Sequence, residues 1–201
     1  MRSIIICGGN VDSYILDYIR DGDYILCADS GYDHARKFKI SPDIVIGDMD
    51  SVKSDYTSEN TVLFPPKKDF TDSELALKFA MDKGFDEILM FGMIGTRMDH
   101  SFANLSLLLN CKGFDAKIID KNNIIQMVFD EITLNGKIGD TISILPFSED
   151  AIGVTTSGLL YTLNNATIKI GTSLGVSNQM TDNVCTIKVK EGKVLVIRSN
   201  D

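Results

Sequence analysis

Ile44-Val-Ile-Gly-Asp-Met-Asp-Ser51 is an apolar run that ends in a glycine and two aspartates, Asp48 and Asp50. Such a run is typical of a buried parallel strand, whose carboxyl end opens into the crevice where α/β sheets bind their ligands. Two acids this close repel each other unless a divalent cation or a shared proton relieves them. Oxygen ligands of this kind suit Mg²⁺, which usually binds together with substrate phosphates. The run therefore predicts a metal–phosphate site in an α/β sheet.

Short apolar runs alternate with helical patterns on both sides of this stretch, through the first 122 residues. Strands joined by helices form parallel sheets that are covered on both faces. We therefore expect an open, mostly parallel α/β sheet here. The expected strands are 3–7, 24–28, 43–46, 61–64, 87–91 and 116–119. The expected helices include one with Ile15, Leu16 and Ile19 on one side, a short one after Gly31, and two longer ones over 72–83 and 98–111.

After residue 122 the helical pattern ends, and short apolar runs separated by turn residues follow. The expected strands are 124–129, 141–145, 166–170, 184–190 and 194–198. Residues 188–194 have the pattern of a hairpin closed at Glu191-Gly192. Short strands at this spacing are typical of a β-sandwich or half-barrel. We therefore expect an α/β domain over residues 1–122 and an all-β sandwich domain over residues 123–201.

The composition excludes several classes of protein. With 201 residues, 44% of them hydrophobic, the chain can bury a normal core. A net charge of −8 without a basic patch argues against nucleic-acid binding. The four cysteines lie far apart without metal-site spacing, which favours buried thiols over a metal or redox role. Since neither a signal peptide nor a membrane-length apolar run is present, we expect a cytoplasmic protein with no membrane partner.

Three further acids follow strands or open helices, namely Asp29, Asp72 and Asp99. In a doubly wound sheet such positions converge on one edge, where five carboxylates would need cations. Each acid also has a structural explanation. Thr71 and Glu74 form a capping box around Asp72. An acid in the first turn of a helix, such as Asp72 or Asp99, is favoured by the helix dipole. Asp29 can hold a turn.

Basic residues and glycines complement these acids. Lys67, Lys68 and Arg97 have the chemistry to clamp phosphate oxygens, although solvated loop charges would look the same. The glycine turns at residues 8–10 and 92–95 could present backbone amides to a phosphate. The motif of the P-loop enzymes is missing, which excludes that class.

Two polar features are more ambiguous. His100 adjoins Asp99, but a lone histidine is more often a hydrogen-bonded structural residue. In the second half, Ser177 and Asn178 offer the donors and acceptors that bind a heterocycle, and they could equally form a turn at the end of a strand.

Taken together, the motifs resemble the thiamine pyrophosphokinase family. The matching pieces are Ala28-Asp-Ser-Gly31, Gly47-Asp-Met-Asp-Ser51, Lys68-Asp-Phe-Thr-Asp-Ser-Glu74, Gly95-Thr-Arg-Met-Asp-His100 with Asn104, Ser157-Gly-Leu-Leu-Tyr161 and Ser177-Asn178. They come in the order of the family and span nearly the whole chain.

The resemblance implies an ATP-binding domain followed by a thiamine-binding domain, in a homodimer with active sites between subunits. The implied reaction is Mg²⁺-dependent transfer of a pyrophosphoryl group from ATP to the thiamine hydroxyl, with release of AMP. The implied metal and catalytic residues are Asp48, Asp50 and Asp72. The residues expected on the nucleotide side are Asp29, Lys68, Arg97, Asp99, His100 and Asn104, and those on the thiamine side are Ser177 and Asn178. Because the chain has no tryptophan, the aromatic platform for thiamine stays unassigned.

Two other functions remain open on the sequence. A phosphatase of the haloacid dehalogenase type would use Asp48 as a covalent nucleophile and Asp50 as acid and base, but its motif normally follows the first strand. A non-catalytic module that binds nucleotide or thiamine would keep the site without turnover.

Overall fold

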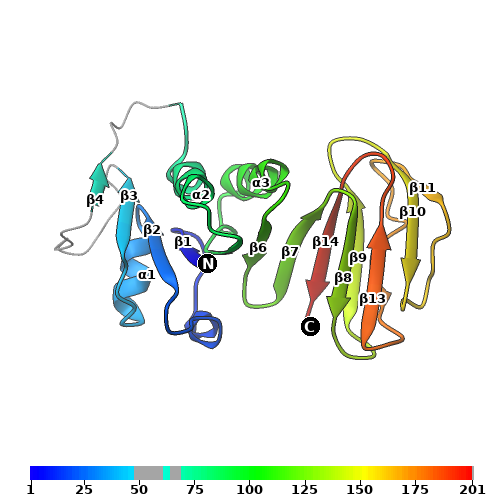
Figure 1. The fold of residues 1–201 in the computed structure, drawn as a ribbon, viewed down its shortest axis with the longest axis horizontal. Coiled ribbons are helices and arrows are strands. Elements are labelled where there is room, and N and C mark those ends of the chain that lie inside the picture. The colour runs from blue at the N-terminus through cyan, green and yellow to red at the C-terminus, as the bar shows by residue number, and fades with distance from the viewer. Residues whose placement is uncertain (48–60, 64–68, 201) are drawn as a thin grey trace. The chain divides into compact units, whose positions relative to one another are not determined.

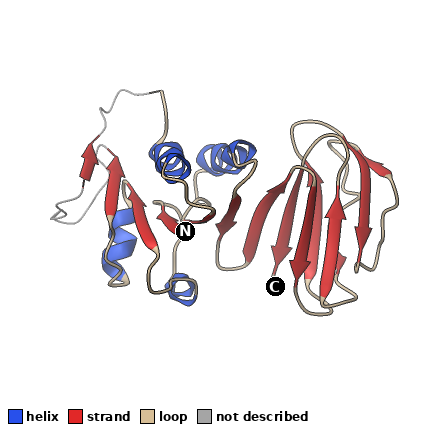
Figure 2. Cartoon of the chain, in the orientation of Figure 1, coloured by secondary structure: helices blue, strands red, loops and turns tan. Residues whose placement is uncertain are grey.

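The computed structural model describes residues 1–47, 61–63 and 69–200. The chain divides into two compact units, Met1–Lys121 and Asn122–Asp201 (Figure 1). Among the described residues, helices occur in the first unit, whereas the second is built of strands and loops (Figure 2). The expectation of an α/β domain followed by an antiparallel β domain is thus confirmed.

The first unit is built on a sheet with the strand order β6-β5-β1-β2-β3-β4, in which the pairings are parallel. Its strands are β1 (Arg2–Ile6), β2 (Tyr24–Ala28), β3 (Ile44–Gly47), β4 (Thr61–Leu63), β5 (Glu87–Phe91) and β6 (Asp115–Ile119). The chain proceeds from β1 outward to β4, then returns to the other side of β1 to form β5 and β6. The direction of winding therefore reverses between β1 and β5, and ligands of open α/β sheets bind at the carboxyl ends of strands at such a switch point.

The helices of this unit are α1 (Gly31–Lys37), α2 (Asp72–Asp82) and α3 (Met98–Leu107), with 3₁₀ turns η1 (Ser13–Asp17) and η2 (Leu108–Asn110). Contacts place α1 against β1 and β2, and α2 against β1, β2 and β3. The helix expected around Ile15 is a 3₁₀ turn, in which Ile15 is buried whereas Leu16 is 48% exposed. A single buried side chain in this segment gives little burial to stabilise a longer helix.

An ion pair connects the start of β1 to the loop before β2. Arg2 donates from Nε and Nη2 to Asp23 at 2.8 and 2.6 Å, and the two side chains are only 10% and 6% exposed. Burial raises the pKa of Asp23, but hydrogen bonds from Arg2 and from the backbone of Arg20 outweigh it and hold the pKa below its usual value. This stabilisation is therefore present above the ordinary carboxyl pKa and is lost as the pH falls through the lowered one.

We expect Asp23→Ala to lower the free energy of unfolding by about 3–5 kcal/mol, because it leaves the Arg2 charge buried without its carboxylate. Chemical denaturation at pH 7 measures the change. Asp21→Ala, at an exposed position in the same loop, serves as the control and should change stability by less than about 0.5 kcal/mol. A loss in Asp23→Ala no larger than in the control would contradict this account.

The second unit consists of antiparallel pairings in the strand orders β12-β9-β14-β7 and β11-β10-β13-β8. Its strands are β7 (Asn123–Val128), β8 (Glu131–Asn135), β9 (Thr141–Pro146), β10 (Ala151–Ser157), β11 (Ala166–Ile168), β12 (Asn178–Gln179), β13 (Val184–Lys188) and β14 (Val194–Ser199). Side chains from both sets of strands share one hydrophobic cluster, including Ile144 and Val196 from the first set and Val154 and Ile187 from the second.

The hairpin expected across Glu191-Gly192 is wrong. Strand β13 pairs with β8 and β10, whereas β14 pairs with β7 and β9, so the chain passes from one set of strands to the other at this turn. Gly192 has a φ of +82°, and a Cβ there would overlap the carbonyl oxygen of Asp150. The predicted turn is present at Gly192. Its residue Glu191 pairs with Ile152 of β10, and the turn does not join two paired strands.

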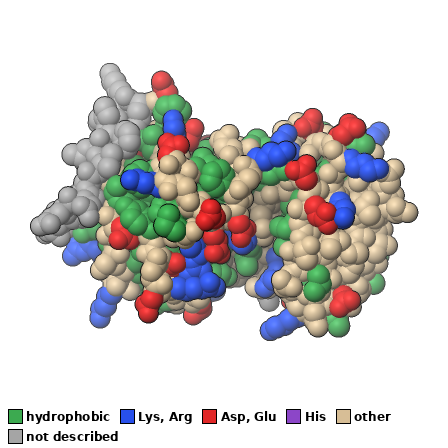
Figure 3. Space-filling model, in the orientation of Figure 1, with side chains coloured by type: hydrophobic (Ala, Val, Ile, Leu, Met, Phe, Trp, Pro, Cys, Tyr) green, Lys and Arg blue, Asp and Glu red, His purple; other side chains and the backbone are tan. Residues whose placement is uncertain are grey.

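On the face of the molecule in Figure 3, the described acidic and basic side chains are interspersed rather than gathered by sign. The helices of the described residues are all too short or too polar to span a membrane.

Candidate functional site

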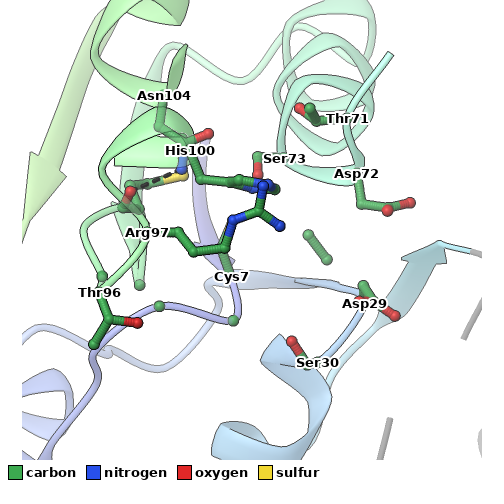
Figure 4. Close-up of a pocket in the computed structure, with 16 residues that line it drawn as sticks. Cys7, Asp29, Ser30, Thr71, Asp72, Ser73, Thr96, Arg97, His100 and Asn104 are labelled. Atoms are coloured by element: carbon green, nitrogen blue, oxygen red, sulfur yellow. Dashed lines mark hydrogen bonds between the residues drawn. The ribbon is translucent and has the colours of Figure 1, made fainter. Parts of the chain in front are cut away.

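A pocket of about 430 Å³ lies at the switch point of the first unit (Figure 4). Its walls come from the segments that follow β1, β2 and β5 and from the first residues of α2 and α3. The lining residues are Cys7, Gly8, Gly9, Ala28, Asp29, Ser30, Thr71, Asp72, Ser73, Gly92, Met93, Gly95, Thr96, Arg97, His100 and Asn104. The first residues of α2 and α3 thus both line the pocket, and the dipoles of the two helices favour an anionic ligand there.

Two glycine turns form the base of this pocket. Gly9 N–H donates to the Gly92 carbonyl, and Asn10 N–H donates to the Ile94 carbonyl, each at 2.8 Å. A Cβ on Gly9 would overlap both of these acceptor oxygens. The turns therefore pack backbone against backbone, which only glycine permits. The expectation that both turns offer free amides to a phosphate is wrong for Gly9 and Asn10, whose N–H groups are already bonded.

Two carboxylates flank the end of β3. Asp29 and Asp72 both line the pocket, and a Cβ on Gly47 would lie 3.2 Å from the Asp29 Cα and 3.2 Å from the Asp72 Oδ1. Asp29 has a φ of 46°, a left-handed conformation that aspartate tolerates better than most residues and that is frequent at functional sites. Thr71 caps α2 by accepting from the Glu74 N–H, as the capping box predicts, and this fixes Asp72 in the first turn.

Arg97 extends from the α3 side into the pocket (Figure 4). Its Nη2 and Nε atoms lie 2.6 and 3.2 Å from the two carboxylate oxygens of Asp99. The hydrogen bond from Arg97 and a second from the His100 backbone hold the pKa of Asp99 at about 2. Asp99 itself does not line the pocket. The pair therefore stays charged above about pH 2 and directs a guanidinium, with its remaining donors, toward the cavity.

His100 and Asn104 also line the pocket from α3. The Asn104 side chain is buried, and its Nδ2 donates to the Met93 carbonyl at 2.7 Å. Ser101, buried on the same helix, accepts from Gly95 N–H at 3.1 Å. Asn104 and Ser101 thus hold the loop after β5 in place. The sequence pattern did not predict these side-chain–backbone hydrogen bonds.

Cys7 is a lining residue that sequence reasoning assigned only to the core. Burial raises the pKa of its thiol to about 12, although a hydrogen bond with Ser73 lowers it somewhat. Cys7 is therefore a neutral thiol at pH 7 and cannot serve as a thiolate nucleophile. All four cysteines are free and buried, as expected.

Asp48, Asp50 and Lys68 lie outside the described residues. Gly47, the residue directly before Asp48, is described, and it lies beside Asp29 and Asp72 of the pocket. Within the described ranges, no group of three or more histidine, cysteine or acidic side chains is placed to hold a metal. Asp29 and Asp72 contribute oxygen donors of the type that Mg²⁺ binds.

In the second unit, the Asn178 side chain is buried and pairs with the backbone of Tyr161. Its Nδ2 donates to the Tyr161 carbonyl at 2.8 Å, and its Oδ1 accepts from the Tyr161 N–H at 3.0 Å. The Tyr161 side chain is 67% exposed. Ser177 is exposed beside it in sequence, with a φ of 56°. Asn178 therefore holds the backbone of the loop that carries Tyr161. No local sequence motif predicts this pairing.

Comparison with known proteins agrees with the division of the chain. The family model "Thiamin pyrophosphokinase, catalytic domain" matches residues 15–119, and "Thiamin pyrophosphokinase, vitamin B1 binding domain" matches residues 130–194. The first match contains the lining residues from Ala28 to Asn104, and the second contains Tyr161, Ser177 and Asn178.

Individual relatives are similar over the full length. A thiamine pyrophosphokinase from Bacillus subtilis (strain 168) is 33% identical, with 100% of both chains covered. The crystal structure of a thiamine pyrophosphokinase from the same species superposes with a TM-score of 0.90 over 100% of both chains, at 30% identity. A thiamin pyrophosphokinase structure from Geobacillus thermodenitrificans gives 0.88 at 27% identity, covering 100% of this chain and 98% of the other.

Proposed function

Because this chain belongs to the thiamine pyrophosphokinase family, we propose that the pocket of its first unit is where ATP reacts. The activity of the chain is that of the family, the ATP-dependent transfer of a diphosphate group to thiamine. The assignment of this pocket to ATP rests on the chemistry of its lining residues. Arg97 and the N-terminus of α3 favour phosphates, while Asp29 and Asp72, the first residue of α2, supply carboxylate oxygens.

We propose that Mg²⁺ binds at the carboxylate side of the pocket, held by Asp72 together with Asp48 and Asp50. Asp72 and Asp29 are placed beside Gly47, and their oxygens suit a hard cation. When bound, the ion neutralises charge that develops on the phosphate oxygens. A carboxylate of this group accepts the proton of the thiamine hydroxyl, since a neutral alcohol attacks more readily as its proton leaves.

The nucleotide side of the proposal consists of Asp29, Lys68, Arg97, Asp99, His100 and Asn104. Arg97, His100 and Asn104 line the pocket. Asp99 bonds to Arg97, and Asn104 also holds the loop after β5 through the Met93 carbonyl. Catalysis is then mostly positioning plus electrostatic stabilisation, as in other phosphoryl transfers.

We expect Asp99→Asn to raise the KM for ATP about threefold to tenfold with a smaller change in kcat, because Arg97 loses the carboxylate that orients it. Steady-state kinetics at saturating thiamine measure the change. Asp82→Asn, which removes an exposed acid from α2, is the matched control. An unchanged KM for ATP in Asp99→Asn would show that Arg97 needs no such partner.

For thiamine, we propose a site in the second unit, over residues 123–201, that includes Ser177, Asn178 and Tyr161. The chain lacks tryptophan, and the exposed Tyr161 ring offers the aromatic surface that a flat, cationic ligand favours. The two hydrogen bonds between the Asn178 side chain and the Tyr161 backbone fix the segment from which this ring projects.

Tyr161→Ala should raise the KM for thiamine about tenfold and leave the KM for ATP within twofold, because only one substrate loses its aromatic contact. Tyr161→Phe is the control and should stay close to the original enzyme, since it keeps the ring. Equal KM values for thiamine in the alanine and phenylalanine variants would exclude Tyr161 from the site.

Several wider expectations remain part of this proposal. They are an open, mostly parallel sheet over residues 1–122, a β-sandwich over residues 123–201, a homodimer with active sites between subunits, and a cytoplasmic location. The parallel pairings of the first unit and the shared hydrophobic cluster of the second support the two statements about the fold.

Product analysis tests the function directly. The protein is incubated with ATP, Mg²⁺ and thiamine, and the products are separated by chromatography. We expect AMP and thiamine diphosphate in equal amounts. Release of inorganic phosphate with a phosphoaspartyl intermediate on Asp48 would instead indicate a phosphatase, and folded protein that binds ATP without turnover would indicate a binding module.

A further inference from the structure

His34 bonds to the glycine turn at Gly8 and Gly9 from a position outside the pocket lining. It lies on α1, does not line the pocket, and its Nε2 is 2.9 Å from the carbonyl oxygen of Gly9. Since a carbonyl oxygen only accepts, the Nε2 atom carries the proton in this bond. The imidazole thus bonds to the backbone of a residue that does line the pocket.

The same glycine is held from its other side by the loop after β5. Its N–H donates to the Gly92 carbonyl, and the N–H of Asn10 donates to the Ile94 carbonyl. Gly9 is therefore bonded through both its N–H and its carbonyl group. The His34 bond adds to the attachment of this turn, because it satisfies the Gly9 carbonyl.

The start of helix α1 is seated closely on the same segment. A Cβ on Gly31 would overlap the carbonyl oxygen of Ile6, and a Cβ on Gly8 would overlap the Oγ of Ser30. These close contacts, one with backbone and one with a side chain, set the distance between α1 and the turn. Because the distance is set, a donor on the fourth residue of α1 can reach Gly9 without reorganisation.

We propose that His34 is a positioning residue for the turn at Gly8 and Gly9, which lines the wall of the pocket. The inference rests on the proposed function, since it assumes that this pocket binds ATP. A turn fixed before ATP arrives does not have to be ordered on binding, so its attachment contributes to affinity. His34 touches neither substrate in this account and acts only through the Gly9 carbonyl.

Two substitutions and one control separate this role from simple packing. His34→Met removes the donor and keeps much of the volume, whereas His34→Gln keeps an N–H donor near the position of Nε2. Lys37→Gln changes an exposed residue on the same helix. Calorimetry with Mg·ATP in the absence of thiamine gives the dissociation constant, and hydrogen–deuterium exchange reports on residues 7–11.

We expect His34→Met to weaken Mg·ATP binding about tenfold, the worth of one hydrogen bond, and to speed exchange in residues 7–11. His34→Gln should bind within threefold of the original protein, and Lys37→Gln within twofold. The KM for thiamine should change less than twofold in all three variants.

Folded His34→Met that binds Mg·ATP within twofold would overturn the proposal, as would His34→Gln that binds as weakly as His34→Met. Should His34→Met fail to fold, His34→Gln still decides, because weak binding by that folded variant contradicts the role of the donor. Absence of AMP formation by the original protein would count against the proposed function alone, since the binding ratios are measured without turnover.

Discussion

Asp72→Asn should lower kcat by about 10²–10³-fold, the scale expected when a charged group that stabilises the transition state is removed. Asp72 lines the pocket, and its Oδ1 lies beside Gly47, where the chain continues to Asp48. The substitution keeps the shape of the side chain and removes its charge. It therefore withdraws one oxygen ligand of the proposed Mg²⁺ site without opening a cavity.

The fold should survive this change. Helix α2 keeps its cap, because Thr71 rather than Asp72 accepts from the Glu74 N–H. Loss of one acid from the first turn costs at most about 1 kcal/mol. Glu74→Gln is the matched control, since it removes an acid from the same turn without touching the pocket. Similar kcat values for the two variants would show that Asp72 contributes only to the helix dipole.

Asp48→Asn and Asp50→Asn should each lower turnover by orders of magnitude while the protein remains folded. Both residues lie outside the described residues, so this expectation rests on the sequence pattern and on the position of Gly47 at the carboxylate edge. Two acids separated by one residue have the spacing to share a cation. Steady-state kinetics with circular dichroism as the folding check measure the effect. Near-normal turnover in either variant would rule out the metal-site assignment.

The dependence on metal concentration separates the roles of these acids. A variant that has lost a metal ligand should regain part of its activity as Mg²⁺ is raised, because the ion binds more weakly but still acts. A variant that has lost the acceptor of the hydroxyl proton should stay slow at every Mg²⁺ concentration. Asp48→Asn, Asp50→Asn and Asp72→Asn can be compared in one such titration.

The alternation of strand and helix was sufficient to predict the first unit, because strands buried on both faces are read directly from apolar runs such as Ile4–Ile6. The strands of the second unit were harder to predict from the sequence. Strand β8 alternates between exposed and partly buried residues, and β10 contains Gly153, so neither has a clear apolar run. The wrong hairpin at Glu191-Gly192 has the same origin, since pairing depends on residues distant in the sequence.

The acids were predicted at the site because their positions follow strand ends, and position along a strand is readable. Asp29, Asp72, Arg97, His100 and Asn104 do line one pocket. What could not be predicted is how side chains bond to backbone across the fold. The attachment of Gly9 by His34 and of Tyr161 by Asn178 depends on contacts between segments 25 and 17 residues apart, which no local motif encodes.

The fate of the phosphates tests the account most directly. ATP labelled at the β-phosphate and ATP labelled at the γ-phosphate are incubated separately with the protein, Mg²⁺ and thiamine. If the pyrophosphoryl group passes as one unit, both labels appear in thiamine diphosphate at the same rate, and the AMP carries neither. Label left in ADP, or found in thiamine monophosphate or inorganic phosphate as the first product, would contradict the account.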